Sequence, residues 1–186
     1  RSLLDVRVVA GELRGRRIEA PRSDATRPTT DKVREAVFNA LGSLDVVDGA
    51  HVVDLFAGTG AMGIEALSRG ASHCTFVESD RGALEVLKQN ISALGLSDRA
   101  TVVAADAVRA ASAQGDVDLL IADPPYGFSE WEMLLTGCGA GFVVVESGRD
   151  IGGIPGWETV REKRYGRTHV AFLRPVDDGN GTVGGE

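Results

Sequence analysis

Residues 52–63 read VVDLFAGTGAMG, an apolar run that breaks into a glycine-rich turn before a second apolar segment begins. This pattern predicts a buried parallel strand, a tight turn and the first turn of a helix. Glycines allow the backbone to approach a ligand closely, and the first N–H groups of a helix present partial positive charge to it. The stretch therefore predicts a ligand site at the carboxyl end of a strand in an α/β fold.

One carboxylate inside this strand, Asp54, narrows the choice of ligand. Gly58, Gly60 and Gly63 match the G-x-G-x-x-G pattern of dinucleotide sites, which alone is a weak signal. Asp54 would repel a diphosphate, whereas it would attract the ammonium group of an amino-acid-bearing ligand. S-adenosylmethionine (AdoMet) is such a ligand, and we predict it as the cofactor.

Strand-like and helix-like segments alternate over the next hundred or so residues. A helix follows the glycine turn and ends at Arg69-Gly70, and a second helix begins after the N-cap residue Asp80. This alternation predicts a parallel sheet covered on both faces, with the ligand at the carboxyl ends of its strands. After the first strand, the expected parallel strands are residues 74–78, 100–104, 117–122 and 141–145.

The N-terminal part predicts a β-hairpin followed by a helix. Residues 6–10 and 16–19 flank a glycine-containing turn, and this turn and the second strand carry arginines. Residues 21–28 form a connector, after which a helix extends to about residue 41. Its expected caps are Thr29, Thr30 and Asp31, and its expected inward stripe is Val33, Val37, Ala40, Leu41 and Leu44.

The C-terminal part also departs from the strand–helix alternation. Residues 159–164 and 169–174 predict an antiparallel hairpin, in which Val170 and Phe172 share one face. A polar, glycine-rich tail follows and is expected to be flexible. We therefore expect a basic hairpin and connector over residues 1–28, a Rossmann-like domain over 29–175 and a tail over 176–186.

Basic residues concentrate at the two ends of an acidic chain, whose net charge is −7. Residues 1–43 hold nine Lys or Arg against six Asp or Glu, and residues 161–186 hold five against four. Residues 44–160 hold six against seventeen. Such basic clusters are typical of polyanion contact, although a merely solvated surface carries the same residues. The residues expected to remain available to a ligand include Arg27, Lys32 and Arg34.

Four carboxylates follow successive strands: Asp54, Glu78, Asp106 and Asp123. One acid at a strand end is an ordinary turn residue, but four beside a glycine turn match separate parts of AdoMet. Glu78 lies twenty residues after Gly58, where an acid accepts hydrogen bonds from ribose hydroxyls. Asp54 and the turn amides suit the methionyl group, and Asp106 suits the adenine. The residues predicted to bind AdoMet are Asp54, Ala57, Gly58, Thr59, Gly60, Glu78, Ser79, Asp106 and Ala107.

The sequence Asp123-Pro124-Pro125-Tyr126 carries the clearest chemical signal. Two prolines fix φ and remove two N–H donors, which leaves carbonyl acceptors at this corner. The Asp123 carboxylate and the Pro124 carbonyl can accept both hydrogens of an exocyclic amine and direct its lone pair toward a methyl group. Tyr126 can stack on the base, a contact worth about 1–3 kcal/mol, and Asp123 can collect the proton late. The motif predicts methylation of an amine on a base.

The segments DLFAGTGAMGIEALSRGA, FVESD, ADAV and ADPPY, in this order and spacing, resemble class I AdoMet-dependent methyltransferases. With VRVVAGELRGRRI, RPTTDKVREAVFN and YGRTHVAFLR, the chain resembles the RsmD family of bacterial 16S rRNA guanine-N2 methyltransferases. The resemblance implies a seven-stranded sheet with its last strand antiparallel, a guanine amine as acceptor, and 16S rRNA in the small ribosomal subunit as partner. It implies a target site at Asp123, Pro124, Pro125 and Tyr126, and RNA contacts at Arg7, Arg14, Arg16, Arg17, Arg27, Arg34, Lys163 and Arg164.

Three other interpretations remain open. The DPPY motif also serves DNA adenine-N6 methyltransferases, and a related motif serves protein glutamine, but the chain lacks a large insertion for DNA recognition and its basic ends favour a polyanion. The glycine pattern also suits a nicotinamide-dependent dehydrogenase, in which neither Asp54 nor DPPY would have a role. A non-enzymatic RNA-binding module is the third interpretation.

The remaining signals concern thiols, metals and membranes. Cys74 and Cys138 are isolated in apolar surroundings, which predicts two buried free thiols and a reducing cytoplasm. The three histidines lack ligand spacing with the cysteines, so we expect no metal. No apolar run approaches the roughly 18 residues that a membrane span needs. Nothing in the chain requires a dimer, and we expect a cytoplasmic monomer.

Overall fold

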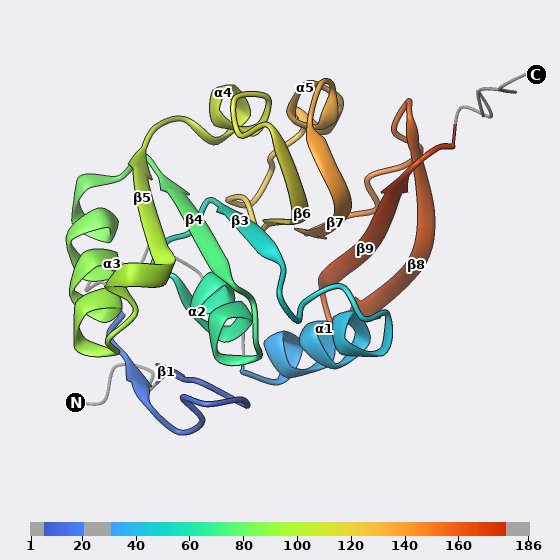
Figure 1. The fold of residues 1–186 in the computed structure, drawn as a ribbon. Helices are drawn as coiled ribbons and strands as arrows, with labels where there is room; N and C mark the ends of the chain where they lie inside the picture. The colour runs from blue at the N-terminus through green and yellow to red at the C-terminus, as the bar shows by residue number, and fades with distance from the viewer. Residues whose placement is uncertain (1–5, 21–30, 178–186) are drawn as a thin grey trace, which may run out of the picture.

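A seven-stranded β-sheet runs through the computed structural model, which describes residues 6–20 and 31–177 (Figure 1). Its strands are β3 (His51–Leu55), β4 (His73–Glu78), β5 (Ala100–Ala104), β6 (Asp116–Ala122), β7 (Gly139–Ser147), β8 (Trp157–Tyr165) and β9 (Thr168–Pro175). They lie in the order β5-β4-β3-β6-β7-β9-β8. The first five are parallel, whereas β9 runs antiparallel to both of its neighbours. The predicted fold class is confirmed.

The order of the strands places a crevice at the centre of this sheet. From β3 the chain adds β4 and β5 on one side, and then returns to add β6 and β7 on the other side. Ligands of open α/β sheets bind where the order reverses, outside the carboxyl ends of the strands. Asp54 pairs with Ile121 and Leu55 pairs with Ala122, so the residues that follow β3 and β6 emerge side by side.

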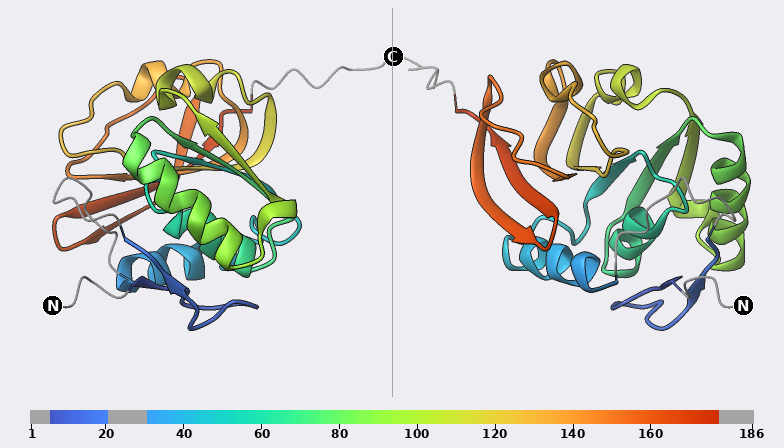
Figure 2. Two further views of the ribbon diagram at one scale, coloured as in Figure 1. Left: turned by 90° about the vertical axis from the view of Figure 1, so that its left-hand side faces the viewer. Right: turned by 180° about the vertical axis from the view of Figure 1, so that it is seen from behind.

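Helices cover both faces of the sheet. They are α1 (Asp31–Ser43), α2 (Ala61–Ser68), α3 (Arg81–Ala93), α4 (Ala107–Ala111) and α5 (Trp131–Leu135), and a short 3₁₀ turn spans Ser97–Arg99. The first three helices lie on one face and the last two on the other (Figures 1 and 2). One apolar cluster contains Phe38, Leu67 and Leu87, and the other contains Ala110 and Leu134. Because both faces are covered, the central strands are continuous apolar runs.

Two glycines allow α2 to lie close to the sheet. Gly60, at the N-terminus of α2, has a φ of 85°, and a Cβ atom there would lie 2.5 Å from Leu87. A Cβ atom on Gly63 would lie 2.3 Å from the Phe76 ring of β4. Any side chain at these positions would displace the helix, so the glycine pattern serves packing as well as ligand approach. As predicted, the helix ends near Arg69: its last residue is Ser68, Arg69 is the C-cap, and Gly70 follows.

The N-terminal hairpin is joined to this core. Its strands β1 (Val6–Arg7) and β2 (Arg17–Ile18) are antiparallel, as expected, but shorter than the predicted segments. Val6, Val8 and Ile18 belong to the same apolar cluster as α1–α3. The hairpin therefore shares the core of the main domain, whereas a boundary at residue 28 had been expected to set it apart. That boundary and the connector, residues 21–28, lie outside the described residues, as do Thr29 and Thr30.

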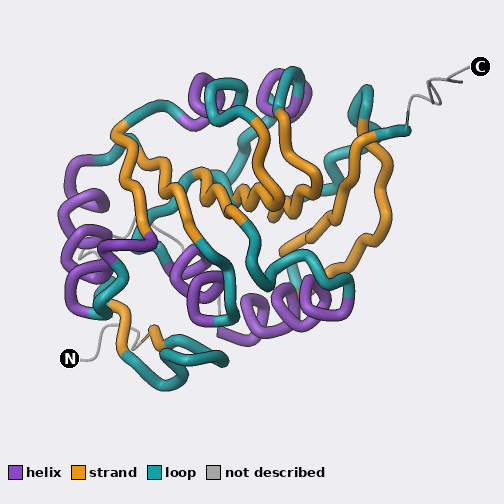
Figure 3. The backbone as a smooth tube through the Cα atoms, viewed as in Figure 1, coloured by secondary structure: helices purple, strands orange, loops and turns teal. Residues whose placement is uncertain are grey.

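Several further elements agree with the sequence predictions where the structure describes them. Asp80 caps α3, its carboxylate accepting a hydrogen bond of 2.8 Å from the Ala83 N–H. Val170 and Phe172 are both buried on the terminal hairpin, whose backbone path is seen most easily in Figure 3. Cys74 is a buried free thiol, but Cys138 is only half-buried. Within residues 6–20 and 31–177, every helix is too short or too polar to cross a bilayer. The expected tail beyond residue 177 lies outside the described residues.

Candidate active site

A cavity of about 700 Å³ opens along the carboxyl ends of four neighbouring parallel strands. The glycine turn after β3 and the DPPY segment after β6 form parts of its wall, because β3 and β6 are adjacent in the sheet. Five acids line it: Glu78 of β4, Asp54 of β3, Asp123 after β6 and Glu146 of β7, one from each strand, and Asp80, the N-cap residue of α3. The cavity is therefore strongly acidic, which favours a cationic ligand.

Asp54 is the most deeply buried of the predicted cofactor residues, with 2% of its surface exposed. Its Oδ2 accepts a hydrogen bond of 2.9 Å from the Gly63 N–H in the first turn of α2. Burial raises the pKa of Asp54 to about 7, and this hydrogen bond opposes the rise. The charges of Asp123 and Glu78 raise the pKa further. An ammonium group in the cavity would stabilise the ionised form.

Glu78 is held at the mouth of the glycine turn by backbone donors. Its Oε2 accepts a hydrogen bond of 2.8 Å from the Gly58 N–H. Its Oε1 accepts two more of 2.8 Å, from the N–H groups of Ser79 and Asp80. Each carboxylate oxygen has two lone pairs, and Oε2 therefore retains accepting capacity toward the cavity. This is the position from which the sequence predicted a contact with ribose.

The glycine turn itself is tightly bonded within the protein. The Ala57 N–H donates to the Val77 carbonyl at 3.0 Å, and the Gly60 N–H donates to the Ala57 carbonyl at 2.7 Å. With the Gly58 N–H bound to Glu78, three of the four turn amides have partners. The predicted contact of this turn with a ligand carboxylate therefore narrows to Thr59, which lines the cavity.

The DPPY segment contributes all four of its residues to the cavity wall. Asp123 follows β6 directly, and its charge reaches Asp54. Tyr126 stands at the rim with 64% of its surface exposed. Its ring lies against Gly148, where a Cβ atom would come within 3.0 Å of a ring carbon. The predicted amine-binding corner and the glycine turn thus face one cavity.

Asp106 and Ala107 are not brought into this cavity, as far as the described residues show. Asp106 follows β5 as expected, but its side chain caps α4 by accepting a hydrogen bond of 3.0 Å from the Arg109 N–H. This contact is the ordinary structural role of an acid that follows a strand. The contact of Asp106 with adenine stays a prediction.

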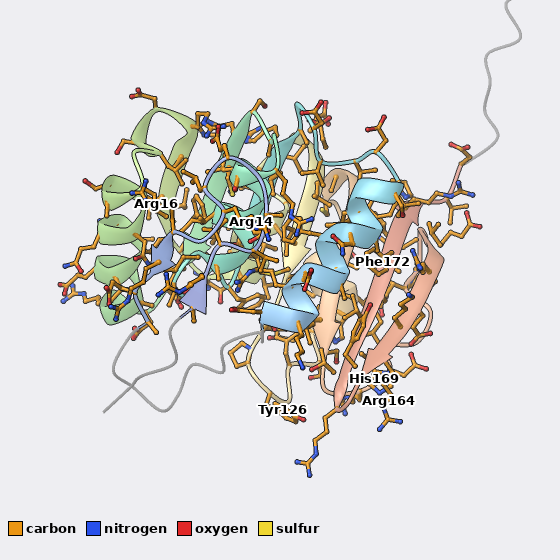
Figure 4. The ribbon with its side chains drawn as sticks, turned by 90° about the horizontal axis from the view of Figure 1, so that it is seen from below. Arg14, Arg16, Tyr126, Arg164, His169 and Phe172 are labelled. Carbon is orange, nitrogen blue, oxygen red and sulfur yellow. The ribbon has the colours of Figure 1, made fainter. Side chains whose placement is uncertain are left out.

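The predicted RNA-binding residues divide into three groups: exposed residues, one residue outside the described part of the chain, and one buried residue, Arg34. Most are exposed, and in Figure 4 Arg14 and Arg16 lie on the hairpin while Arg164 lies at the far end of the molecule with Tyr126. Arg27 lies outside the described residues. The exposed members are Arg7, Arg14, Arg16 and Arg17 on the hairpin and Lys163 and Arg164 on β8.

The prediction that Arg34 is available to a ligand is wrong. Arg34 is fully buried in α1, where its Nε lies 3.4 Å from the Glu65 carboxylate and its Nη2 lies 2.9 Å from Asp31. Nη2 also donates to the Arg7 carbonyl of the hairpin. Its charge is thus compensated inside the protein, and it serves the attachment of the hairpin.

Sequence reasoning missed two features of the cavity. Phe56, Phe128 and Trp131 form an aromatic row, with ring centroids 5.3 and 4.8 Å apart, and all three line the wall. Phe56 has a φ of 59°, an uncommon backbone state for a residue other than glycine. Glu146 was missed because the fifth strand was expected to end at residue 145. The described residues include no cluster of three or more His, Cys, Asp or Glu placed to hold a metal ion.

Comparison with known proteins connects this fold and cavity to a class of enzymes. The structure of "Putative methyltransferase yhhF" from Escherichia coli matches with a TM-score of 0.80 and 34% sequence identity. The match covers 92% of this chain and 98% of that chain. The fold and the site are those of a Rossmann-like methyltransferase.

The sequence relatives narrow the class to a family. A family model described as conserved hypothetical protein 95 matches residues 6–174. "Putative rRNA methyltransferase YlbH" of Bacillus subtilis is 40% identical over 186 residues, covering 91% of this chain and 98% of its own length. "Ribosomal RNA small subunit methyltransferase D" of Escherichia coli is 40% identical over 122 residues, covering 65% of this chain and 60% of its own. The chain belongs to this family, the RsmD family.

Proposed function

We propose that the protein transfers a methyl group from AdoMet to the exocyclic N2 amine of a guanine in 16S rRNA of the small ribosomal subunit. The observation that carries this proposal is the shared cavity of the glycine turn and the DPPY segment. The names of the relatives support ribosomal RNA as the substrate class. Such a substrate makes the cytoplasm its place of action, and one chain supplies all of the cavity lining that the structure describes.

The residues present fit AdoMet. The buried carboxylate of Asp54 suits the ammonium group, and Glu78 suits the ribose hydroxyls. A Cβ atom on Gly58 would meet only the Phe56 carbonyl oxygen, at 4.0 Å, so the turn leaves open space on this side. When bound, AdoMet supplies an electrophilic methyl group on a sulfonium centre. The acids around the cavity favour that positive charge.

The DPPY segment prepares the acceptor. The Asp123 carboxylate and the Pro124 carbonyl accept the two hydrogens of the amine, which directs the nitrogen lone pair into the cavity. Tyr126 stacks on the base, a contact worth about 1–3 kcal/mol. Nitrogen forms its new bond to carbon as the bond from carbon to sulfur breaks, and Asp123 takes the proton that nitrogen releases. Most of the rate enhancement comes from positioning the two reactants in line.

RNA contacts surround this corner. His169 of β9 pairs with Ser147 of β7, and Arg164 pairs with His169, which places the exposed arginine beside the strand end that leads to Gly148 and the Tyr126 ring. The arginines of the N-terminal hairpin provide a second basic surface. Two basic surfaces suit a folded RNA that presents phosphates on more than one side of the target base.

The test is methyl transfer from labelled AdoMet to small ribosomal subunits that lack the modification, with duplex DNA as the competing substrate. We expect labelled N2-methylguanine at one nucleotide of 16S rRNA. Mapping that nucleotide in cells with and without the protein identifies the target. Labelling of adenine in DNA without labelling of subunits would instead establish the DNA adenine-N6 alternative.

A further inference from the structure

Of the four acids that the parallel strands bring to the cavity, Glu146 is the one that the proposed mechanism leaves without a role. It lies in β7 with only 4% of its surface exposed, and it lines the cavity. Ala122 of β6 pairs with Val145 of β7, so the next residues, Asp123 and Glu146, leave these strands as neighbours. The amine-binding carboxylate therefore has a second carboxylate at its side.

The position of Glu146 relative to the other acids assigns it to the acceptor. Along the sheet the acids follow the order Glu78, Asp54, Asp123, Glu146, because their strands lie in the order β4-β3-β6-β7. The two acids suited to AdoMet lie on one side of Asp123, and Glu146 lies on the other. Directly after the end of β7, Gly148 lies against the ring of Tyr126, the stacking residue.

The surroundings of Glu146 make a carboxylate costly there. The three residues before it, Val143, Val144 and Val145, are buried valines, and its register partner on β9 is buried Val170. A strand residue that only completed the core would be apolar like these neighbours. Burying a carboxylate costs free energy, so its presence at this position of the cavity wall indicates a polar role.

The chemistry of the base indicates what a carboxylate at this place would bind. In guanine the ring N1–H is a donor and lies next to the N2 amine, whereas N1 of adenine is an acceptor. We propose that Glu146 accepts a hydrogen bond from the N1–H of the target base and thereby selects guanine. This inference rests on the proposed function. Asp123 and Pro124 accept the two hydrogens of the N2 amine, and Glu146 accepts the hydrogen of the adjacent N1.

The experiment compares guanine with a base that lacks N1–H and the 6-oxo group, and the Glu146→Gln variant then attributes the difference to N1. Small subunits are reconstituted with 16S rRNA that carries either guanine or 2-aminopurine at the mapped nucleotide; 2-aminopurine keeps the 2-amino group but lacks N1–H. For the wild-type protein we expect kcat/KM to be about 10-fold or more lower with 2-aminopurine, which is the scale of discrimination by a base-edge contact.

The variant Glu146→Gln tests the residue itself. Its kcat/KM with guanine should fall about 10- to 100-fold, and its guanine to 2-aminopurine ratio should shrink to within about threefold. Its affinity for AdoMet, measured by calorimetry, should stay at the wild-type value. Glu85→Gln is the matched control, since Glu85 is an exposed acid on α3 and not a residue of the cavity wall as described, and it should behave as wild type.

Each other outcome overturns the inference. Wild-type protein that methylates 2-aminopurine as well as guanine contradicts recognition of N1–H, and this comparison holds even where Glu146→Gln fails to fold. A Glu146→Gln protein that keeps its guanine activity and its base preference contradicts the role of this residue. Wild-type protein that methylates neither base disproves the proposed function, and the inference with it, so the two failures are distinguishable.

Discussion

Asp54 links cofactor binding to pH at the scale of a single residue. Burial raises its pKa from 3.8 to about 7. Between about pH 4 and pH 7 the folded protein therefore holds a proton that the unfolded chain has released. The free energy of unfolding consequently falls as the pH rises through this window, by an amount on the order of a few kcal/mol in total. A cationic ligand beside Asp54 stabilises the ionised carboxylate. Binding therefore offsets the fall in the free energy of unfolding with rising pH.

We predict that Asp54→Asn raises the melting temperature of the ligand-free protein at pH 8 by about 2–8 °C, because a buried charge is removed. At pH 5, where Asp54 is already protonated, the change should be small. Affinity for AdoMet at pH 8 should fall about 10-fold or more, because the ammonium group loses its partner. Differential scanning calorimetry and isothermal titration check both effects. An equal shift in melting temperature at pH 5 and pH 8 would contradict the prediction that Asp54 is protonated at pH 5 and ionised at pH 8.

For Asp123→Asn we predict a loss in kcat of about 100-fold or more, because the amine loses its proton acceptor. RNA binding should persist, which separates an enzyme from a plain RNA-binding module. The same substitution should lower the pH at which AdoMet binding is half-maximal, since the Asp123 charge helps to raise the pKa of Asp54. Asp98→Asn, at an exposed acid far along the sequence, is the control. Undiminished methyl transfer would disprove the mechanism.

The sequence predicted most of this site because each parallel strand is an apolar run that ends at an acid. That rule located Asp54, Glu78 and Asp123 correctly at one edge. The same pattern, a run of valines followed by an acid, is present at Glu146, so the sequence carried a signal for this residue that the prediction did not use. The left-handed backbone of Phe56 and the aromatic row beyond Tyr126 could not be predicted, since both depend on contacts between separate loops.

At the scale of the elements, one buried acid attaches the N-terminal hairpin to the domain. The carboxylate of Glu65 in α2 accepts hydrogen bonds from the N–H groups of Val9 and Ala10, at 2.8 and 3.0 Å. It also lies 3.4 Å from Arg34 and 2.7 Å from Arg69. The helical spacing of Arg34 with Val37 and Leu41 placed it on the inward face of α1, yet its charge suggested exposure. Its compensating partner comes from another helix, which local sequence does not reveal.

We predict that Glu65→Ala lowers the free energy of unfolding by about 3–5 kcal/mol, because it leaves buried cations and two backbone donors unpaired. Urea denaturation followed by circular dichroism measures the change. The control, Glu35→Ala, removes an exposed acid of α1 and should change stability by less than about 0.5 kcal/mol. Similar stability of the two variants would show that Glu65 contributes little to the attachment of the hairpin, which Ser68 and Asn90 also bind.

At the scale of the whole molecule, the acidic cavity lies between two basic surfaces. The N-terminal hairpin and the β8–β9 turn lie at different ends of the molecule (Figure 4). The acidic centre favours the sulfonium ligand, whereas the basic surfaces suit phosphates. The sequence showed this division of charge, but only the fold shows that the β8–β9 hairpin, which carries Arg164, contributes Thr168 to the cavity wall.

We predict that affinity for the RNA substrate falls steeply with added salt. Replacing Arg14, Arg16 and Arg17 with Ala should reduce the slope of log K against log [salt] by about 2–3, because each phosphate contact contributes a little under one. Filter binding between roughly 50 and 200 mM salt measures the slope. Melting temperature should stay near that of the wild type, since the three side chains are exposed. An unchanged slope would show that the hairpin arginines do not contact the RNA phosphates.

The bonds from Glu65 to the hairpin backbone have a geometric consequence. A hairpin tied to α2 by buried hydrogen bonds keeps its arginines at a constant separation from the target corner. Such a protein selects its target nucleotide by the position of that nucleotide in the folded RNA. The identity of the neighbouring bases then has little effect on selection. Shortening or lengthening the RNA between the two contact points would then abolish methylation, even with the target guanine intact.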